Sequence, residues 1–154
     1  MKKSAKSLIM QNIIHQSQDT LSFETNGQGL YEVTKEVTDW IKKQDLGIGI
    51  FSLYCCHTSA SLVIQENADP SVVSDLESFF KKLVPEELSR YRHISEGADD
   101  MPGHIKSALT QTTLTIPIRN GNLLLGTWQG IFLFEHRILP HTRRLVFHGI
   151  GSPK

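Results

Sequence analysis

The segment that decides the fold runs from Tyr54 to Pro70 and has the sequence YCCHTSASLVIQENADP. It follows an apolar run at 48–53, passes through small hydroxyl residues into a second apolar run at 62–64, and ends on polar residues. An imidazole, three hydroxyls, an amide and two carboxylates therefore lie at strand ends and beside a helix start, where proteins usually place chemistry. The segment predicts one wall of a functional site.

The elements next to this segment follow from the same patterns. Residues 49–56 form a largely apolar run that predicts a strand buried on both faces, and 61–65 predict a second strand. Asp69 as the N-cap and Pro70 at the first helical position predict a helix that continues to about Pro85. On capping grounds alone, Asp69 has a structural role, which does not exclude a functional one.

The rest of the chain alternates between strand and helix patterns, and Asn120-Gly121 is a strong hairpin signal. The remaining predicted strands are at 7–15, 21–25, 112–119, 122–126, 127–135 and 144–150, and the remaining predicted helices at 30–45 and 102–111. Strands at both ends with helices between them predict a single α+β domain over 1–154. We expect a mixed, mostly antiparallel, barrel-like sheet, two to three helices and a flexible N-terminus at 1–6.

Composition limits the classes of function. The chain has 154 residues and a formal net charge of zero, which argues against a general nucleic-acid partner. Its two cysteines, Cys55 and Cys56, are neighbours that would point to opposite faces of a strand, so we expect no disulfide between them and one buried thiol. The apolar run after the basic N-terminus is too short for a signal peptide or a membrane span, so we expect a cytoplasmic protein with no membrane partner.

Three of the seven histidines, His57, His93 and His104, lie where polar residues converge. Three imidazoles would bind a zinc-like ion and leave a coordination position open for substrate. Their spacing matches no local zinc signature, so a polar, hydrogen-bonded cleft without metal is the alternative.

Carboxylates near these histidines are candidates for proton transfer. Glu66 and Glu96 would act as general base or acid if partly desolvated, and solvated loop carboxylates are the alternative. Asp99 and Asp100 are adjacent acids for which a magnesium ligand role is conceivable and a solvated turn is the simpler interpretation.

A phosphate site would have to be built from hydroxyls, helix N-termini and arginines, because the chain has no glycine-rich phosphate loop. Thr58 and Ser59 are the candidate hydroxyl donors. Trp128 would flank a flat ligand, although aromatic residues in such a segment are more often part of the core. Gln129 and Glu135 share the other face of the same predicted strand and would point into the same cleft.

Taken together, these motifs resemble the YjbQ-like family of uncharacterised proteins. The resemblance is carried by HTSA at 57–60, ENADP at 66–70, EGADDMPGHIK at 96–106, LGTWQGI at 125–131 and Glu135. It implies a compact α+β fold, a homotrimer and a weak thiamine-phosphate synthase activity, which joins a hydroxymethylpyrimidine pyrophosphate to a thiazole phosphate and releases pyrophosphate. The family's polar motif positions match His57, Glu66, Asn67, Asp69, His93, Glu96, His104, Gln129 and Glu135.

Two departures from the family pattern stand out. Gly103 replaces the usual alanine at a helix start. Residues 136–144 replace an Asp-Gly-Pro-Arg-like turn, which leaves the local loop shape and the choice of substrate open.

The leading hypothesis is a thiamine-phosphate synthase-like transferase that acts on a phosphorylated metabolite, with zinc or magnesium as the possible cofactor. The alternatives are a metal-dependent hydrolase that uses three histidines and a non-catalytic, trimeric phosphometabolite-binding protein. The assigned roles are catalytic for His57, Glu66, Glu96 and Asp69, substrate-binding for Thr58, Ser59, Asn67, Trp128, Gln129 and Glu135, and metal-binding for His57, His93 and His104.

Overall fold

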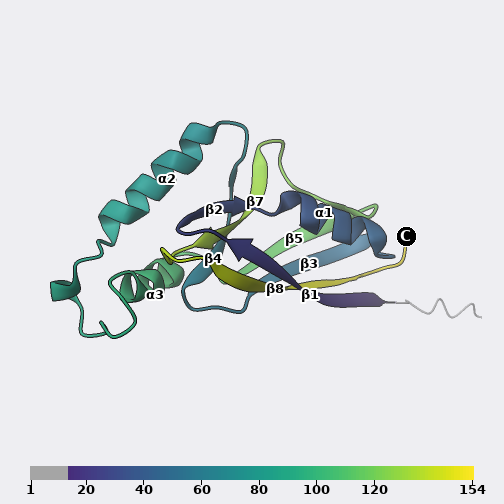
Figure 1. The fold of residues 1–154 in the computed structure, drawn as a ribbon. Helices are drawn as coiled ribbons and strands as arrows, with labels where there is room; N and C mark the ends of the chain where they lie inside the picture. The colour runs from purple at the N-terminus through teal and green to yellow at the C-terminus, as the bar shows by residue number, and fades with distance from the viewer. Residues whose placement is uncertain (1–13) are drawn as a thin grey trace, which may run out of the picture.

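The strands of the computed structural model, which describes residues 14–154, form two antiparallel sheets (Figure 1). The five-stranded sheet has the order β1-β8-β3-β5-β6, and the three-stranded sheet has the order β2-β7-β4. Their bounds are β1 His15–Thr25, β2 Gly29–Glu32, β3 Ile48–Cys55, β4 Ala60–Glu66, β5 Thr113–Arg119, β6 Asn122–Leu123, β7 Gln129–Glu135 and β8 His141–Gly151. The predicted single α+β domain with a mostly antiparallel, curled sheet is confirmed.

Three α-helices complete the fold: α1 Thr34–Lys43, α2 Pro70–Leu83 and α3 Asp100–Leu109, with a short 3-10 turn, η1, at Leu88–Arg90. The helix α1 packs on the sheets and contributes Val37, Trp40 and Ile41 to the core. The helix α2 lies at the periphery (Figure 1), contacts the three-stranded sheet through Glu77 and Phe80, and has no buried residue. No helix in the described part of the chain is long and apolar enough to cross a membrane.

The core lies between the sheets and α1. Strand β5 contributes every second side chain to it, which is the period of a half-buried strand. At its centre, Phe51 and Phe147 are fully buried and meet edge to face, with ring centroids 5.7 Å apart. The buried thiol is Cys55, and both cysteines are free as predicted.

The helix cap at Asp69 and the hairpin at Asn120-Gly121, both predicted from local sequence, are confirmed. The side chain of Asp69 caps α2 by accepting a hydrogen bond from the backbone N–H of Ser71 at 2.9 Å. Asn120 and Gly121 have φ angles of 50° and 71°, as a tight hairpin between β5 and β6 requires.

Several predicted bounds were wrong, in one case because pairing across a sheet overrides local periodicity. The helix predicted from Leu30 begins at Thr34, since residues 29–32 pair with β7 as strand β2. The strand predicted at 122–126 ends at Leu123, and α3 begins at Asp100 rather than at Pro102. Of the strand predicted at 7–15, residues 7–13 lie outside the described residues, as does the predicted flexible N-terminus at 1–6.

Strand β3 was predicted to be buried on both faces, and this was also wrong. Its side chains alternate, with Phe51 and Leu53 in the core and Ile48, Ile50 and Tyr54 exposed on the outer face. No layer of the described chain covers this outer face of the five-stranded sheet.

Candidate functional site

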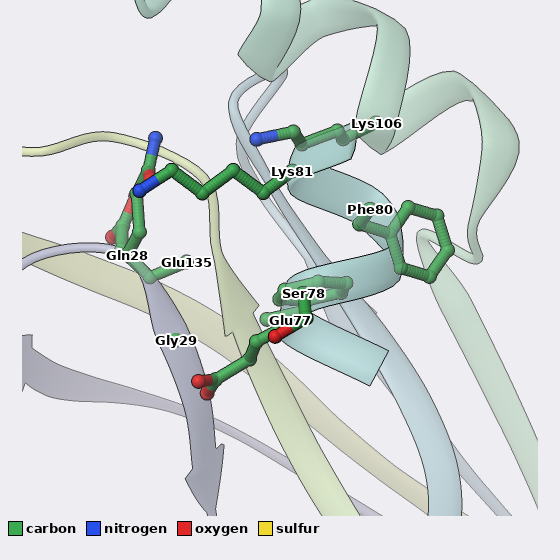
Figure 2. A pocket seen from close by; sticks show the side chains of 9 residues that line it. Gln28, Gly29, Glu77, Ser78, Phe80, Lys81, Lys106 and Glu135 are labelled. Carbon is green, nitrogen blue, oxygen red and sulfur yellow. The ribbon is translucent and has the colours of Figure 1, made fainter. Parts of the chain in front are cut away.

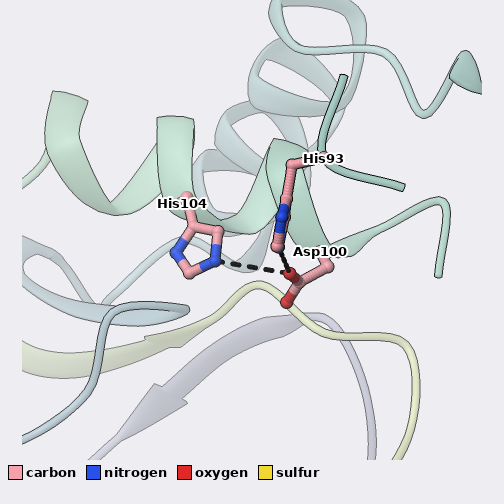
Figure 3. Close-up of side chains that lie close together, drawn as sticks. All are labelled: His93, Asp100 and His104. Carbon is pink, nitrogen blue, oxygen red and sulfur yellow. Dashed lines mark hydrogen bonds and ion pairs between the residues drawn. The ribbon is translucent and has the colours of Figure 1, made fainter. Parts of the chain in front are cut away.

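Two imidazoles and one carboxylate meet at the start of α3 (Figure 3). His93 Nε2 lies 2.7 Å from Asp100 Oδ2, and His104 Nε2 lies 3.3 Å from the same oxygen. Asp100 and His104 are one helical turn apart, so they share a face of α3, while His93 comes from the preceding loop. One atom from each of the three side chains lies within 4.8 Å of the others, which is the spacing of a candidate metal centre.

The hydrogen bonds of His104 test whether these residues fit a metal ion. Its Nδ1 lies 3.1 Å from the carbonyl oxygen of Thr58, and its Nε2 faces Asp100 Oδ2. Both partners are acceptors, and a neutral imidazole has only one N–H. If Nδ1–H donates to Thr58, the lone pair on Nε2 opposes a carboxylate oxygen, which requires a proton or a metal ion between them. A carbonyl that fixes the outer nitrogen is also the usual support of a metal-bound histidine.

Asp100 is buried and is held in place by Arg137. The guanidinium bonds Asp100 Oδ1 through Nη1, Asp99 Oδ2 through Nε at 3.0 Å, and the carbonyl oxygen of Glu96 through Nη2 at 2.8 Å. Asp100 Oδ2 therefore stays free to face the imidazoles. Burial would raise the pKa of Asp99, but the backbone N–H of Ile138 and the Arg137 guanidinium outweigh it and hold that pKa below its ordinary value.

Sequence reasoning missed Arg137 and ranked Asp100 too low. Asp99 and Asp100 are 8% and 2% exposed, so the solvated-turn interpretation was wrong. Arg137 lies in the 136–144 segment that departs from the family pattern. The contact could have been predicted from an arginine in that segment and two adjacent acidic residues earlier in the chain, because arginine commonly pairs with carboxylates.

His57 does not join this group. Its Nε2 accepts a hydrogen bond from the backbone N–H of Arg144 at 2.7 Å, which places the ring proton on Nδ1. Burial lowers the pKa of His57, and the nearby Arg143 and Arg144 lower it further, which favours the neutral ring. It lines an open pocket with Thr58, Ser59 and Arg143.

Glu135 and Ser59 belong to a buried polar cluster that adjoins this pocket through Ser59 and Arg143. The Glu135 carboxylate accepts hydrogen bonds from Arg143 Nε and Nη2, both at 2.6 Å, from Thr25 Oγ1 at 2.7 Å and from the backbone N–H of Arg137 at 2.9 Å. Burial would raise the pKa of Glu135, but these donors lower it below its ordinary value. Arg143 Nη2 also lies 3.1 Å from Ser59 Oγ. Both predicted ligand-binding side chains are therefore engaged within the chain.

A second set of predicted site residues lies at the other end of β4. Glu66 is the last residue of that strand, about 20 Å along it from Ala60, which lies at the His57 end, and Asn67 and Asp69 follow directly. Glu66 pairs in register with Gln129, and Asn67 Nδ2 donates to Glu32 Oε1 at 2.8 Å.

Trp128 lies beside this second set and is 64% exposed, so the core interpretation of this residue was wrong. Within one chain, the structure brings together Thr58, His93, Glu96 and His104, and it separates them from the set near Glu66. The Glu96 carboxylate lies 4.0 Å from His93 Nε2.

The fold and motifs match known proteins. The family model described as UPF0047 protein YjbQ-like matches residues 19–152. A UPF0047 protein of Synechocystis is 50% identical over 137 residues, which cover 89% of this chain and 93% of that protein. The UPF0047 protein YjbQ of Escherichia coli is 44% identical over 130 residues, which cover 84% of this chain and 94% of that protein.

Solved structures agree with this result. A conserved hypothetical protein from Thermus thermophilus superposes with a TM-score of 0.74 at 32% identity, over 83% of this chain and 97% of that chain. A YbjQ-like protein of unknown function from Sulfolobus solfataricus shares the fold, with a TM-score of 0.78 at 22% identity, over 90% of this chain and 100% of that chain. The chain therefore belongs to the UPF0047 YjbQ-like family.

Proposed function

We propose that this protein is a divalent-metal-dependent transferase that acts on a phosphorylated small molecule, with His93, Asp100 and His104 as the metal ligands. The observation that carries the proposal is the placement of His104 between two acceptors, Thr58 O and Asp100 Oδ2. Thiamine phosphate formation is the reaction that the family resemblance suggests. A bound divalent cation would supply neutralisation of the negative charge that develops on a pyrophosphate leaving group.

The chain's own residues would position this chemistry. Thr58 O fixes the orientation of His104, and Arg137 fixes Asp100, so the ligand atoms are held before substrate arrives. Formation of thiamine phosphate joins a neutral ring nitrogen to a carbon as the bond from that carbon to pyrophosphate breaks. That step needs charge stabilisation but no general base.

The second candidate function is a metal-dependent hydrolase, and the position of Glu96 is the observation that favours it. Its side chain is 65% exposed and its Oε1 lies 4.0 Å from His93 Nε2, so it is placed to take a proton from water beside the metal group. Glu96→Gln separates the two functions, since it would abolish hydrolysis and leave the transferase rate largely unchanged.

The first experiment is the metal content of protein purified without an affinity tag. We expect about one equivalent in the wild type and loss of it in folded His93→Ala, Asp100→Asn and His104→Ala. His57→Ala is the matched control and should keep the metal. Loss in His57→Ala as well would favour the three-histidine set, and no metal in any sample after addition of zinc, manganese or magnesium would refute the centre.

Activity is tested next with the metal-loaded protein. Thiamine phosphate formation that is lost in His104→Ala and kept in Glu96→Gln would support the transferase. Release of phosphate from the pyrophosphate substrate alone, lost in Glu96→Gln, would favour the hydrolase. Absence of both reactions in a protein that binds metal would leave the binding-protein hypothesis.

We also propose that the chain assembles as a homotrimer. The support is the uncovered outer face of the five-stranded sheet, where Ile48, Ile50 and Ile150 are 67%, 48% and 38% exposed. Contiguous exposed apolar groups usually mark an interaction surface. Light scattering should give three times the 17.4 kDa of one chain, and Ile50→Lys should reduce that mass. A monomeric wild type would refute the proposal.

A further inference from the structure

A second cavity lies between α2, α3 and the end of β7, and it is lined by none of the proposed metal ligands (Figure 2). Its volume is about 230 Å³. The α2 residues Glu77, Ser78 and Lys81 form one wall, and Lys106 reaches into it from α3. Since helical residues advance by about 100° each, Asp100 and Lys106 leave α3 on faces about 120° apart. The cavity is therefore distinct from the metal group.

Lys106 is the unusual residue in this cavity. It is 4% exposed, yet within residues 14–154 no carboxylate oxygen lies within 4.0 Å of its Nζ, and no hydrogen bond from it is formed. A buried ammonium normally has an ion-pair partner, because an uncompensated charge is costly to remove from water. The only fully buried side-chain nitrogen or oxygen without a partner in the described residues is His136 Nδ1, so the Nζ atom of Lys106 opens into the cavity, where an anion would give it the ion-pair partner that it lacks.

A second ammonium faces the same space. Lys81 lines the cavity, and Figure 2 shows Lys81 and Lys106 extending toward the side occupied by Gln28. The Gln28 amide is anchored, because its Nε2 donates to Glu86 Oε1 and, at 3.0 Å, to the carbonyl oxygen of His136. Two ammoniums that line one cavity repel each other, and an anion between them would offset that repulsion.

The carboxylate of the same wall is turned away from the ammoniums. Glu77 Oε1 accepts a hydrogen bond from the backbone N–H of Leu30 at 3.0 Å, and Figure 2 shows this carboxylate pointing toward β2. Phe80 and Phe134 meet edge to face, with centroids 5.2 Å apart, and both line the cavity. The second carboxylate of the lining, Glu135, is paired with Arg143, so the cavity offers two ammoniums and an apolar wall to a ligand.

We propose that this cavity binds the phosphate group of a small phosphomonoester between Lys81 and Lys106, with the organic part against Phe80 and Phe134. The two ammoniums match the charge of a phosphate dianion, and the volume admits a phosphate with a small organic group. The metal group takes no part in this site, so each proposal can fail without the other.

The test measures binding of inorganic phosphate to protein freed of metal with a chelator, so that the metal group does not contribute. Wild type, Lys81→Met, Lys106→Met and Lys82→Met are compared by calorimetry and by melting temperature. Lys82 is the matched control, since it is the exposed neighbour on α2 and does not line the cavity. We expect wild type and Lys82→Met to bind alike, and Lys81→Met and Lys106→Met to bind at least tenfold more weakly.

The outcomes decide the proposal in both directions. Lys81 is exposed, so Lys81→Met will fold and keeps the test valid even if Lys106→Met does not. A higher melting temperature of Lys106→Met without phosphate would support an uncompensated ammonium, and a lower one in folded protein would contradict it. No phosphate binding by wild type, or equal binding by all four proteins, would overturn the site. Tighter binding of phenyl phosphate than of phosphate would support the apolar wall.

Discussion

The buried ion pair between Glu135 and Arg143 allows a quantitative test of how burial determines the contribution of an ion pair to stability. The perturbation is Glu135→Gln, which keeps the shape of the side chain and removes its charge. Every partner of this carboxylate is a donor: Arg143 through two nitrogens, Thr25 through its hydroxyl and Arg137 through its backbone N–H. A glutamine amide must therefore turn its NH₂ group toward at least one donor.

The magnitude follows from burial. Glu135 and Arg143 are 0% and 4% exposed, so the variant leaves a guanidinium inside the protein without a counter-charge. Removing one partner of a buried pair costs about 3–5 kcal/mol in the free energy of unfolding. In either orientation the NH₂ group faces one N–H of Arg143 and one other donor. The less costly orientation faces Thr25 as the other donor, because its hydroxyl has a second acceptor in the carbonyl oxygen of His141 at 3.2 Å. We expect a loss of about 4 kcal/mol, within the ~5–15 kcal/mol stability of a typical domain.

The assay is urea unfolding followed by circular dichroism and by tryptophan fluorescence. The matched control is Asp39→Asn in the pair between Lys35 and Asp39, which has the same N–O distance of 2.6 Å but is exposed. Its free energy of unfolding should stay unchanged within error, because solvent screens an exposed pair. If Glu135→Gln lost no more stability than Asp39→Asn, burial would not govern the strength of this pair. A second variant that adds Arg143→Met should regain part of the loss.

Three further predictions concern single residues. Gly103→Ala should raise the free energy of unfolding by about 0.5–1 kcal/mol in urea titrations, because alanine favours the helix more than glycine does. The new Cβ would lie 3.4 Å from Ser59 Cβ, which is an ordinary contact, so a lower free energy of unfolding would reveal a clash. Trp128→Ala should leave the free energy of unfolding unchanged, since the side chain is 64% exposed. Trp40 is 7% exposed, so Trp40→Ala should lower that free energy by about 3–5 kcal/mol, and equal losses in the two variants would contradict the burial argument. Burial lowers the pKa of His136 to about 3 from 6.5, so the unfolded chain binds the proton first and stability falls as the pH drops from 6.5 toward 3. Between pH 6.5 and pH 5 this amounts to about 2 kcal/mol, a difference that a comparison with His136→Asn should show and that identical pH profiles would refute.

Local chemistry made several elements predictable. Asp69 and Pro70 marked the start of α2, and Asn120 and Gly121 marked the hairpin, because a cap or a tight turn depends only on residues two or three positions apart. The family motifs identified His93 and His104 as site candidates. The alternation in β5 was also visible, since a half-buried strand shows its period in the sequence.

Other features depended on partners distant in the chain. Residues 29–32 carry a helical pattern but form β2, because β7 offers them an unpaired edge. Arg137 and Asp100 are 37 residues apart, and only the packing of α3 near the loop after β7 joins them.

The sequence by itself determined where most strands and helices lie and which residue types gather near them. The tertiary structure decided which of these residues meet: His93 and His104 with Asp100 rather than with His57, Glu135 with Arg143, and Lys106 with a cavity instead of a carboxylate. The physical reason is the distance along the chain over which each kind of interaction acts. Propensities and caps act within a few residues, whereas burial and charge pairing depend on segments that become neighbours only when the two sheets and the helices pack.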